Sequence, residues 1–142
     1  MKAIEMMDLE NGAPVQGQET VIHFEEGLIG FSDHKRFMLL ENAYLSPFRL
    51  LQAEDASDVG FLVLEPTIRV PEYSSLVPKR EWEALGIEDP ADGVAFVTVI
   101  LGSSAATSTA NFQAPILINC RKMIGRQVIL TDSDFSVRQP LV

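Results

Sequence analysis

The sequence predicts an all-β, mainly antiparallel fold, either a compact small barrel or a sandwich, with one short helix near residues 78–85. Short apolar and β-branched runs recur along the chain at close spacing, with turn residues between them. Several of these runs are almost continuously apolar, which is typical of strands that are covered on both sides. Only one segment has a helical pattern, whereas a parallel βαβ sheet would need a helix between most strands.

Seven apolar segments are predicted to form the strands. They are residues 19–24, 36–41, 48–53, 59–66, 94–102, 115–119 and 126–131. After the first of them, the glycines of GLIGF (residues 27–31) can turn the chain sharply. A hairpin turn is expected at Gly125, in the segment MIGRQ.

The helical pattern lies in PKREWEALGI. Pro78 fits the first turn of a helix, and Gly86 can end it. Trp82 and Leu85 are three residues apart and would share one face. The central apolar runs are expected to build one core, whose predicted members are Phe61, Leu62, Val63, Leu64, Phe96, Val97, Ile116 and Ile118.

The length and composition predict a single domain over residues 1–142. A chain of this size with 46% apolar residues can bury a real core without disulfides or metal. No run approaches the ~18 apolar residues that span a bilayer, so no membrane association is expected. The first ten residues contain one Lys and several acids and do not resemble a secretory signal peptide. We therefore expect a cytoplasmic protein.

The charge is strongly negative and unevenly distributed. The formal net charge of -9 opposes direct binding to a phosphate backbone, so nucleic acid is not an expected partner. Residues 1–34 carry seven acids and one Lys, and residues 81–120 carry five acids and no base. If either region forms a face, its natural partner is basic. Simple solubility explains the same imbalance, and both interpretations stay open.

The residues that usually carry catalysis or bind metals are sparse and scattered. Cys120 follows a predicted strand and is expected to be a small packed residue at the strand end rather than a nucleophile. His23 and His34 are the two histidines, and with one Cys the chain does not supply zinc ligands in any usual spacing. Asp132 and Asp134 lack the further ligands of a calcium loop. The sequence therefore predicts no enzyme, no cofactor and no metal.

Two segments are candidate partner-binding sites. In TANFQAPILIN (residues 109–119), Asn111, Phe112 and Gln113 either brace an irregular loop or are presented to a partner. Around GLIGF, the loop carries the carboxylates Glu25, Glu26 and Asp33 near the aromatic Phe31. These four residues would suit a basic protein surface, unless Phe31 belongs to the core and the acids are merely solvated.

The order of these segments resembles the FliW family of flagellar assembly factors. The similar segments are HFEEGLIGFSDHKRFMLLE, PFRLLQAEDASDVGFLVLEP, STANFQAPILIN and RQVILTDSDF, which together cover roughly residues 20–138. The resemblance implies a compact antiparallel β fold and a regulatory protein that binds flagellin and the RNA-binding repressor CsrA in turn, relieving repression of flagellin synthesis. It implies no small-molecule ligand. The alternative is a flagellin-specific export chaperone without a CsrA role.

Overall fold

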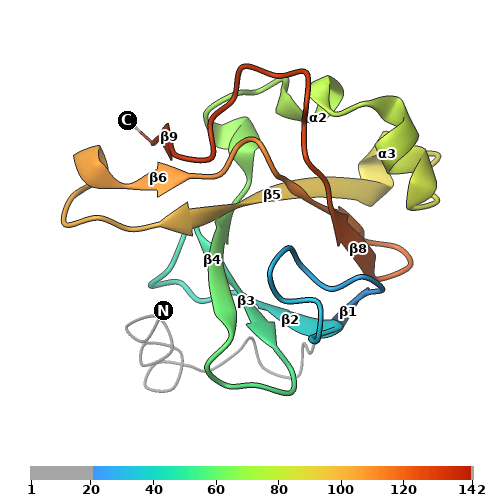
Figure 1. The fold of residues 1–142 in the computed structure, drawn as a ribbon, viewed down its shortest axis with the longest axis horizontal. Helices are drawn as coiled ribbons and strands as arrows, with labels where there is room; N and C mark the ends of the chain where they lie inside the picture. Colours follow the sequence, from blue (N-terminus) through green and yellow to red (C-terminus); the bar gives the residue numbers. More distant parts are fainter. Residues whose placement is uncertain (1–20, 142) are drawn as a thin grey trace.

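The computed structural model describes residues 21–141, whose strands close into a barrel (Figure 1). Its seven strands follow one another around the barrel in the order β4, β3, β2, β1, β8, β7, β5. They are β1 (Val21–Phe24), β2 (Arg36–Leu40), β3 (Arg49–Ala53), β4 (Gly60–Leu64), β5 (Gly93–Ile100), β7 (Ile116–Asn119) and β8 (Ile124–Gln127).

The barrel closes where β4 pairs with β5. Val63 lies opposite Thr98 and Leu64 lies opposite Val97. Neighbouring barrel strands are antiparallel except β1 and β8, which run parallel over two residue pairs. The predicted all-β, mainly antiparallel class is confirmed, and of the two architectures the structure adopts the barrel. Closure removes the exposed edges that an open sheet of these strands would have.

A short sheet extends from one end of the barrel. The last residues of β5 pair with β6 (Thr109–Ala110), which pairs in turn with β9 (Gln139–Pro140). Figure 1 shows the β5–β6 hairpin reaching away from the barrel, with β9 beside it. Because β6 leads directly into the segment 111–115, this hairpin sets where the TANFQAP loop enters the barrel.

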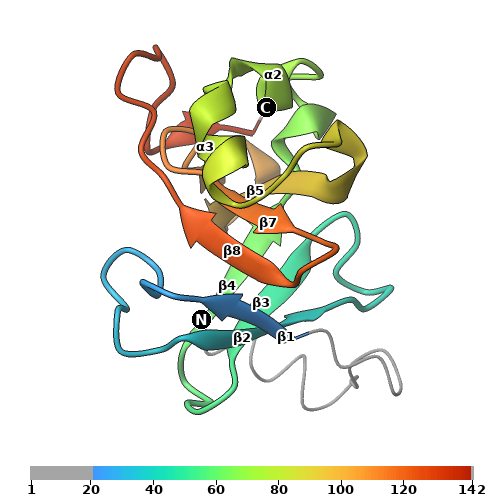
Figure 2. The ribbon, with the colours of Figure 1, turned by 90° about the vertical axis from the view of Figure 1, so that its right-hand side faces the viewer.

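The predicted short helix is present as α3 (Lys79–Ala84). A second helix, α2 (Tyr73–Leu76), precedes it, and Figure 2 shows both on one side of the barrel, near β5 and β7. Three single-turn 3₁₀ helices complete the structure: η1 (Pro66–Ile68), η2 (Pro90–Asp92) and η3 (Ala105–Thr107). These four additional elements are too short for an apolar period to reveal them.

The strand predictions differ from the structure mainly near β8. The strand predicted at residues 126–131 lies earlier in the chain: β8 begins at Ile124 and ends at Gln127. Gly125 is therefore not a turn residue, and that prediction is wrong. It lies within β8 opposite Ile118, and a Cβ at this position would stand 2.5 Å from Cε2 of Phe24. Residues 19 and 20 of the first predicted strand lie outside the described residues.

Two apolar clusters form the core. One contains Phe24, Phe37 and Phe96, and the other joins the barrel to Tyr73 and the helical side of the molecule. Seven of the eight predicted core residues are buried: Leu62, Val63, Leu64, Phe96, Val97, Ile116 and Ile118. They divide between the two clusters, so the prediction of a single core is wrong. The eighth, Phe61, is only partly buried and packs at the edge of the first cluster.

The buried Tyr73 connects α2 to the segment after β6. Its hydroxyl donates a hydrogen bond to the carbonyl oxygen of Phe112, and the two rings pack edge to face with centroids 5.5 Å apart. Burial raises the pKa of Tyr73 far above its ordinary value. The phenol is thus held neutral and serves as a hydrogen-bond donor inside the core.

We predict that Phe96→Ala destabilises the fold by about 3–5 kcal/mol, because the ring is only 2% exposed and its loss leaves a cavity. Urea unfolding measures the change in the free energy of unfolding. An unchanged midpoint would contradict the packing of Phe96 described above.

We predict that Tyr73→Phe costs about 1–3 kcal/mol, because the carbonyl of Phe112 loses its donor. The raised pKa also predicts an alkaline loss of stability. The unfolded chain releases the phenolic proton first, so the stabilisation is complete below about pH 10 and falls as the pH rises further. Unfolding should be measured below and above about pH 10. The loss of stability at the higher pH should be smaller in Tyr73→Phe than in the parent protein. Tyr44→Phe, at the exposed second tyrosine, is the matched control and should retain the parent's pH dependence.

Candidate protein-binding groove

The GLIGF and TANFQAP segments, far apart in the sequence, line the same groove. The hollow has a volume of about 300 Å³. Its walls come from the loop after β1, from β4 and β5, from the loop before β7, and from β8 and the chain that follows it. The lining residues are Leu28, Ile29, Phe61, Thr98, Asn111, Gln113, Ala114, Gln127, Ile129 and Val137.

The GLIGF loop is shaped by its two glycines. Gly27 and Gly30 have φ angles of 68° and 84°, which residues with a side chain rarely adopt. The turn between them is closed by a hydrogen bond of 2.7 Å from the amide of Phe31 to the carbonyl of Leu28. As a result Leu28 points into the core while Ile29, the next residue, remains 55% exposed. The predicted sharp turn is confirmed.

Gln127 holds the two segments together. Its Oε1 accepts a hydrogen bond from the amide of Ile29 at 2.9 Å, and its Nε2 donates to the carbonyl of Ala114, also at 2.9 Å. One side-chain amide from β8 thus satisfies a donor of the GLIGF loop and an acceptor of the TANFQAP loop. The width of the groove is therefore set by a fixed bridge.

Asn111 mainly supports its own loop. Its Oδ1 accepts hydrogen bonds from the amides of Gln113, at 3.2 Å, and Ala114, at 3.1 Å. Its backbone amide donates to the carbonyl of Thr98 on β5. The loop-bracing interpretation of TANFQAP is thus supported by the bonds of Asn111, while Asn111 and Gln113 still line the groove.

Three β-branched side chains at the groove are unusually exposed. Ile29, Ile129 and Val137 have 55%, 57% and 51% of their surface accessible. Scattered exposed apolar residues are ordinary, but several around one hollow indicate a contact surface for another protein. Ile129 lies between the buried residues Val128 and Leu130, so the chain after β8 turns every second side chain outward.

The remaining candidate residues occupy different places. Phe112 is 1% exposed and packs against Tyr73 and Phe135, so its predicted presentation to a partner is wrong. It belongs to the core because the loop turns its ring inward. Phe31 is 37% exposed and packs edge-on against Phe61 with centroids 5.0 Å apart, at the groove wall.

The acidic candidates do not gather in the groove. Glu25 and Glu26 are exposed and line a separate hollow of about 240 Å³, together with His23 and Arg126. Asp33 is exposed in the loop that follows Phe31. The structure therefore brings Asn111 and Gln113 to the groove and packs Phe31 against the groove residue Phe61, but it buries Phe112 and places the Glu pair elsewhere.

None of the side chains considered for catalysis or metal binding lines the groove. Cys120 is exposed at the end of β7 rather than packed, which corrects the expectation of a buried residue. Partial burial of the thiol, with Asp92 and Glu65 nearby, raises the pKa of Cys120 and disfavours the reactive thiolate. Within residues 21–141, no group of three or more His, Cys, Asp or Glu side chains could hold a metal ion. No helix in the described part of the chain is long and apolar enough to cross a membrane.

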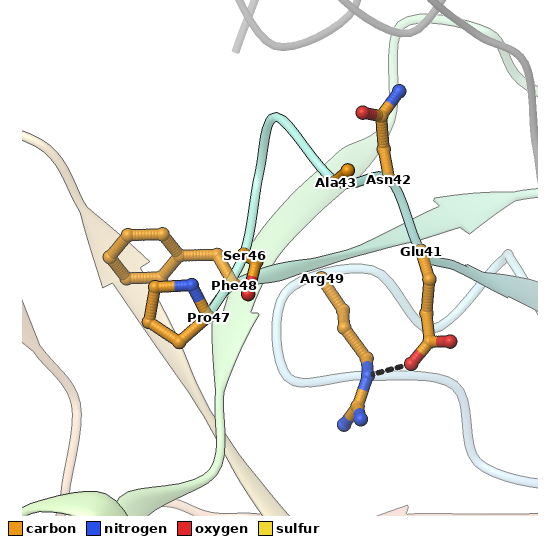
Figure 3. A pocket seen from close by; sticks show the side chains of 7 residues that line it. All are labelled: Glu41, Asn42, Ala43, Ser46, Pro47, Phe48 and Arg49. Carbon is orange, nitrogen blue, oxygen red and sulfur yellow. Dashed lines mark hydrogen bonds and ion pairs between the residues drawn. The ribbon is translucent and has the colours of Figure 1, made fainter.

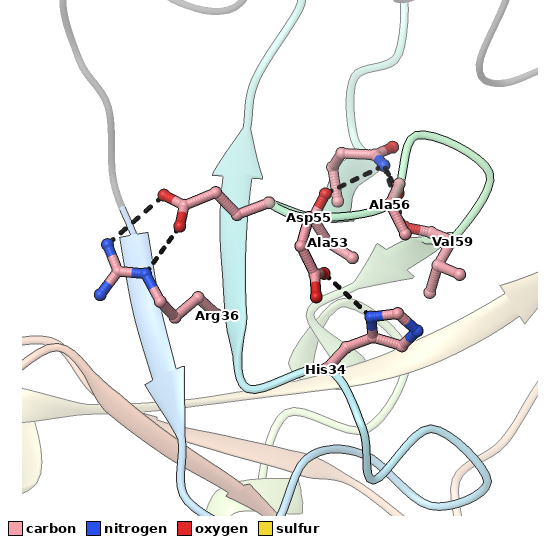
Figure 4. Close-up of polar contacts among 8 residues, drawn as sticks. His34, Arg36, Ala53, Asp55, Ala56 and Val59 are labelled. Atoms are coloured by element: carbon pink, nitrogen blue, oxygen red, sulfur yellow. Dashed lines mark hydrogen bonds and ion pairs between the residues drawn. The ribbon is translucent and has the colours of Figure 1, made fainter.

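Two polar clusters brace the loops between β2, β3 and β4. Arg49 joins Glu41 at 2.7 Å and Glu65 at 3.2 Å, and Figure 3 shows the first pair beside a hollow under the β2–β3 loop. In Figure 4, Nδ1 of His34 lies 2.9 Å from Oδ1 of Asp55. Arg36 forms an ion pair with the carboxylate of Glu54.

The hydrogen bond from His34 lowers the pKa of Asp55, so that carboxyl stays ionised beside its partner. In the same turn, Nε2 of Gln52 donates to the carbonyls of Ala56 and Val59. Each of these side chains thus helps to hold the turn after β3.

The fold and the groove define a small β-barrel protein with fixed loops and exposed apolar side chains. Comparison with known proteins agrees with this class. The family model described as FliW protein matches residues 9–141, so the chain belongs to the FliW family. Its members named below are flagellar assembly factors, and the chain has a role in flagellar assembly.

Two curated relatives illustrate the similarity. The flagellar assembly factor FliW of Leptospira interrogans is 34% identical over 98% of this chain and 93% of its own length. That of Thermoanaerobacter pseudethanolicus is 34% identical over 87% of this chain and 83% of its own length. A crystal structure of the flagellar assembly factor FliW superposes with a TM-score of 0.79 at 32% identity, covering 91% of this chain and 89% of that one.

We predict that Asn111→Ala destabilises the fold by about 1–2 kcal/mol, because two loop amides lose their acceptor. The free energy of binding a partner should change less than the free energy of unfolding. Asn111→Asp retains an acceptor oxygen and serves as the matched variant, with most of the parent stability expected in thermal unfolding. A fully stable Asn111→Ala protein that no longer binds a partner would reverse the roles assigned to this side chain.

Proposed function

We propose that this chain is a cytoplasmic partner-switching regulator of flagellar assembly. It binds a CsrA-type RNA-binding repressor, which relieves repression of flagellin synthesis, and it alternately binds flagellin. Membership of the FliW family supports the flagellar role. The observation that carries the proposal is the groove with Ile29, Ile129 and Val137 exposed around it, since such a surface binds protein and needs no covalent chemistry.

The charge of the chain favours a basic partner. The segment that connects Ile129 to Val137 carries the exposed carboxylates Asp132 and Asp134, and the formal net charge of the whole protein is -9. Opposite charges speed the encounter with an RNA-binding protein, whose own surface must be basic. Once bound, the acidic chain adds negative potential near the RNA site and repels phosphate.

If the repressor and flagellin bind the same groove, their binding is mutually exclusive. If both partners use the apolar side chains at Ile29 and Ile129, a groove filled by one partner cannot accept the other. The relative concentrations and affinities of the two partners then decide which complex forms. When flagellin leaves the cell, the freed groove becomes available to the repressor.

The alternative function is a flagellin-specific export chaperone. An apolar groove can also cover a sticky segment of a single client, without any role for CsrA. The two functions differ in whether purified CsrA binds and whether flagellin displaces it.

We predict that the double variant Ile29→Asn, Ile129→Asn binds both partners at least about tenfold more weakly, because each exposed anchor contributes about 1 kcal/mol or more. Calorimetry with purified CsrA and with purified flagellin measures both affinities. The control is Ile68→Asn, an equally exposed isoleucine on η1 outside the groove, which should bind both partners normally.

Each outcome of this experiment separates the proposals. Loss of both affinities supports one shared groove. If the parent protein does not bind CsrA and the double variant loses flagellin binding, the results indicate the chaperone. Normal binding of both partners by the folded double variant would show that this groove is not the interface.

A further inference from the structure

Another hollow lies between the helices and the start of β5. Its volume is about 450 Å³, within the range of roughly 300–1,000 Å³ that is usual for ligand pockets. It shares no lining residue with the groove. Gly93 of this pocket and Thr98 of the groove are five residues apart on β5, a separation of roughly 16 Å. The lining residues are Ser74, Ser75, Val77, Lys79, Trp82, Glu83, Ile87, Glu88, Pro90 and Gly93.

Trp82 is the largest side chain in the wall, and both edges of its indole are fixed. The Nε1 donates a hydrogen bond to the carbonyl of Ser74 at 3.2 Å. On the other edge, the position that a Cβ of Gly93 would occupy lies 3.0 Å from Cζ3 of the ring. With both edges held and the side chain only partly buried, a flat aromatic surface remains to line the cavity.

The rest of the apolar wall is aliphatic. Val77 and Ile87 are buried, and Pro90 adds a rigid ring at the start of η2. Gly93 lets this wall pack closely, because a Cβ there would stand 2.9 Å from Cδ1 of Ile87. The pocket therefore has a closely packed apolar wall against which an alkyl stem can lie.

The rim is acidic. Glu83 and Glu88 line the pocket, and neither takes part in any ion pair among residues 21–141. Glu81, on the same helix, differs because it already pairs with Arg126 at 3.4 Å. Lys79 is the basic residue of the wall, so its lining charge sums to a net negative value. This is the acidic region that the sequence places after residue 80.

We propose that this pocket binds a basic side chain, Arg or Lys, presented by an exposed segment of a protein partner. The aliphatic stem of the side chain packs along Val77, Ile87 and the indole of Trp82. Its charge lies between the carboxylates of Glu83 and Glu88, close enough to the ring for a cation–π contact. Arg is favoured over Lys because its planar guanidinium stacks on an aromatic surface and is less strongly hydrated.

The proposal goes beyond the groove and does not depend on which partners the groove binds. An anionic side chain would meet Glu83 and Glu88 without compensation, and a neutral apolar one would leave both carboxylates unused. A partner that filled the groove and this pocket together would be held at two points roughly 16 Å apart, which raises affinity and fixes orientation.

Trp82 is the single tryptophan of the chain, so its fluorescence reports on this pocket directly. The probes are acetyl-Ala-Leu-Arg-Ala-amide and the same peptide with Glu in place of Arg. The Arg peptide should produce a saturable change in emission, and the Glu peptide should not. In the double variant Glu83→Gln, Glu88→Gln, the Arg peptide should bind about tenfold more weakly, since each exposed charge contributes about threefold.

The control variant is Glu25→Gln, Glu26→Gln, which removes the same charge from a hollow that shares no lining residue with this pocket and should bind the Arg peptide as the parent does. Circular dichroism confirms that each variant is folded. An equal response to the two peptides, or unchanged binding in the Glu83 and Glu88 variant, would overturn the proposal. Because the groove is intact in these variants, the result is independent of the partner-binding test described above.

Discussion

The contact between Phe24 and Gly125 is the constraint on which the barrel and its groove depend. Here β1 and β8 pair in parallel over two residues, His23 with Ile124 and Phe24 with Gly125. The ring of Phe24 occupies the space that any side chain at Gly125 would need. The glycine therefore lets an aromatic core residue sit directly under the neighbouring strand. Without this close approach β1 would move away from β8, and the GLIGF loop that follows β1 would lose its place at the groove.

Side-chain amides then turn this barrel into a scaffold with fixed loops. Gln127 bridges two loops at the groove, Asn111 closes the turn before β7, and Gln52 holds the turn after β3. Asn119 works in the same way at the other end of β7, since it donates to the carbonyl of Leu85 after α3 and accepts from two amides of the β7–β8 turn. Because these amides satisfy backbone groups, the exposed side chains between them are left for binding and are held in a pre-organised arrangement.

The sequence revealed the local features more fully than the long-range ones. Apolar runs located the strands, and the helical spacing in 78–85 located α3, because both depend on neighbouring residues. The choice of a barrel depends on the pairing of β4 with β5, which no local pattern encodes. Phe112 looked exposed among polar neighbours, but its partner Tyr73 lies in a helix too short to predict. Ile129 could have been found, since the alternation of buried Val128 and Leu130 around it already turns it outward.

The proposed partner switching needs binding that is specific and also reversible, and the arrangement of the surface around the groove suits both demands. A few exposed anchors at a groove of about 300 Å³ supply modest apolar burial, so no single contact makes the complex permanent. The dispersed carboxylates act at longer range and chiefly raise the rate of encounter with a basic partner. The charges thus set the rate of association, and the apolar contacts set how long the complex lasts. Because different residues supply the two properties, a substitution can change either one without altering the other.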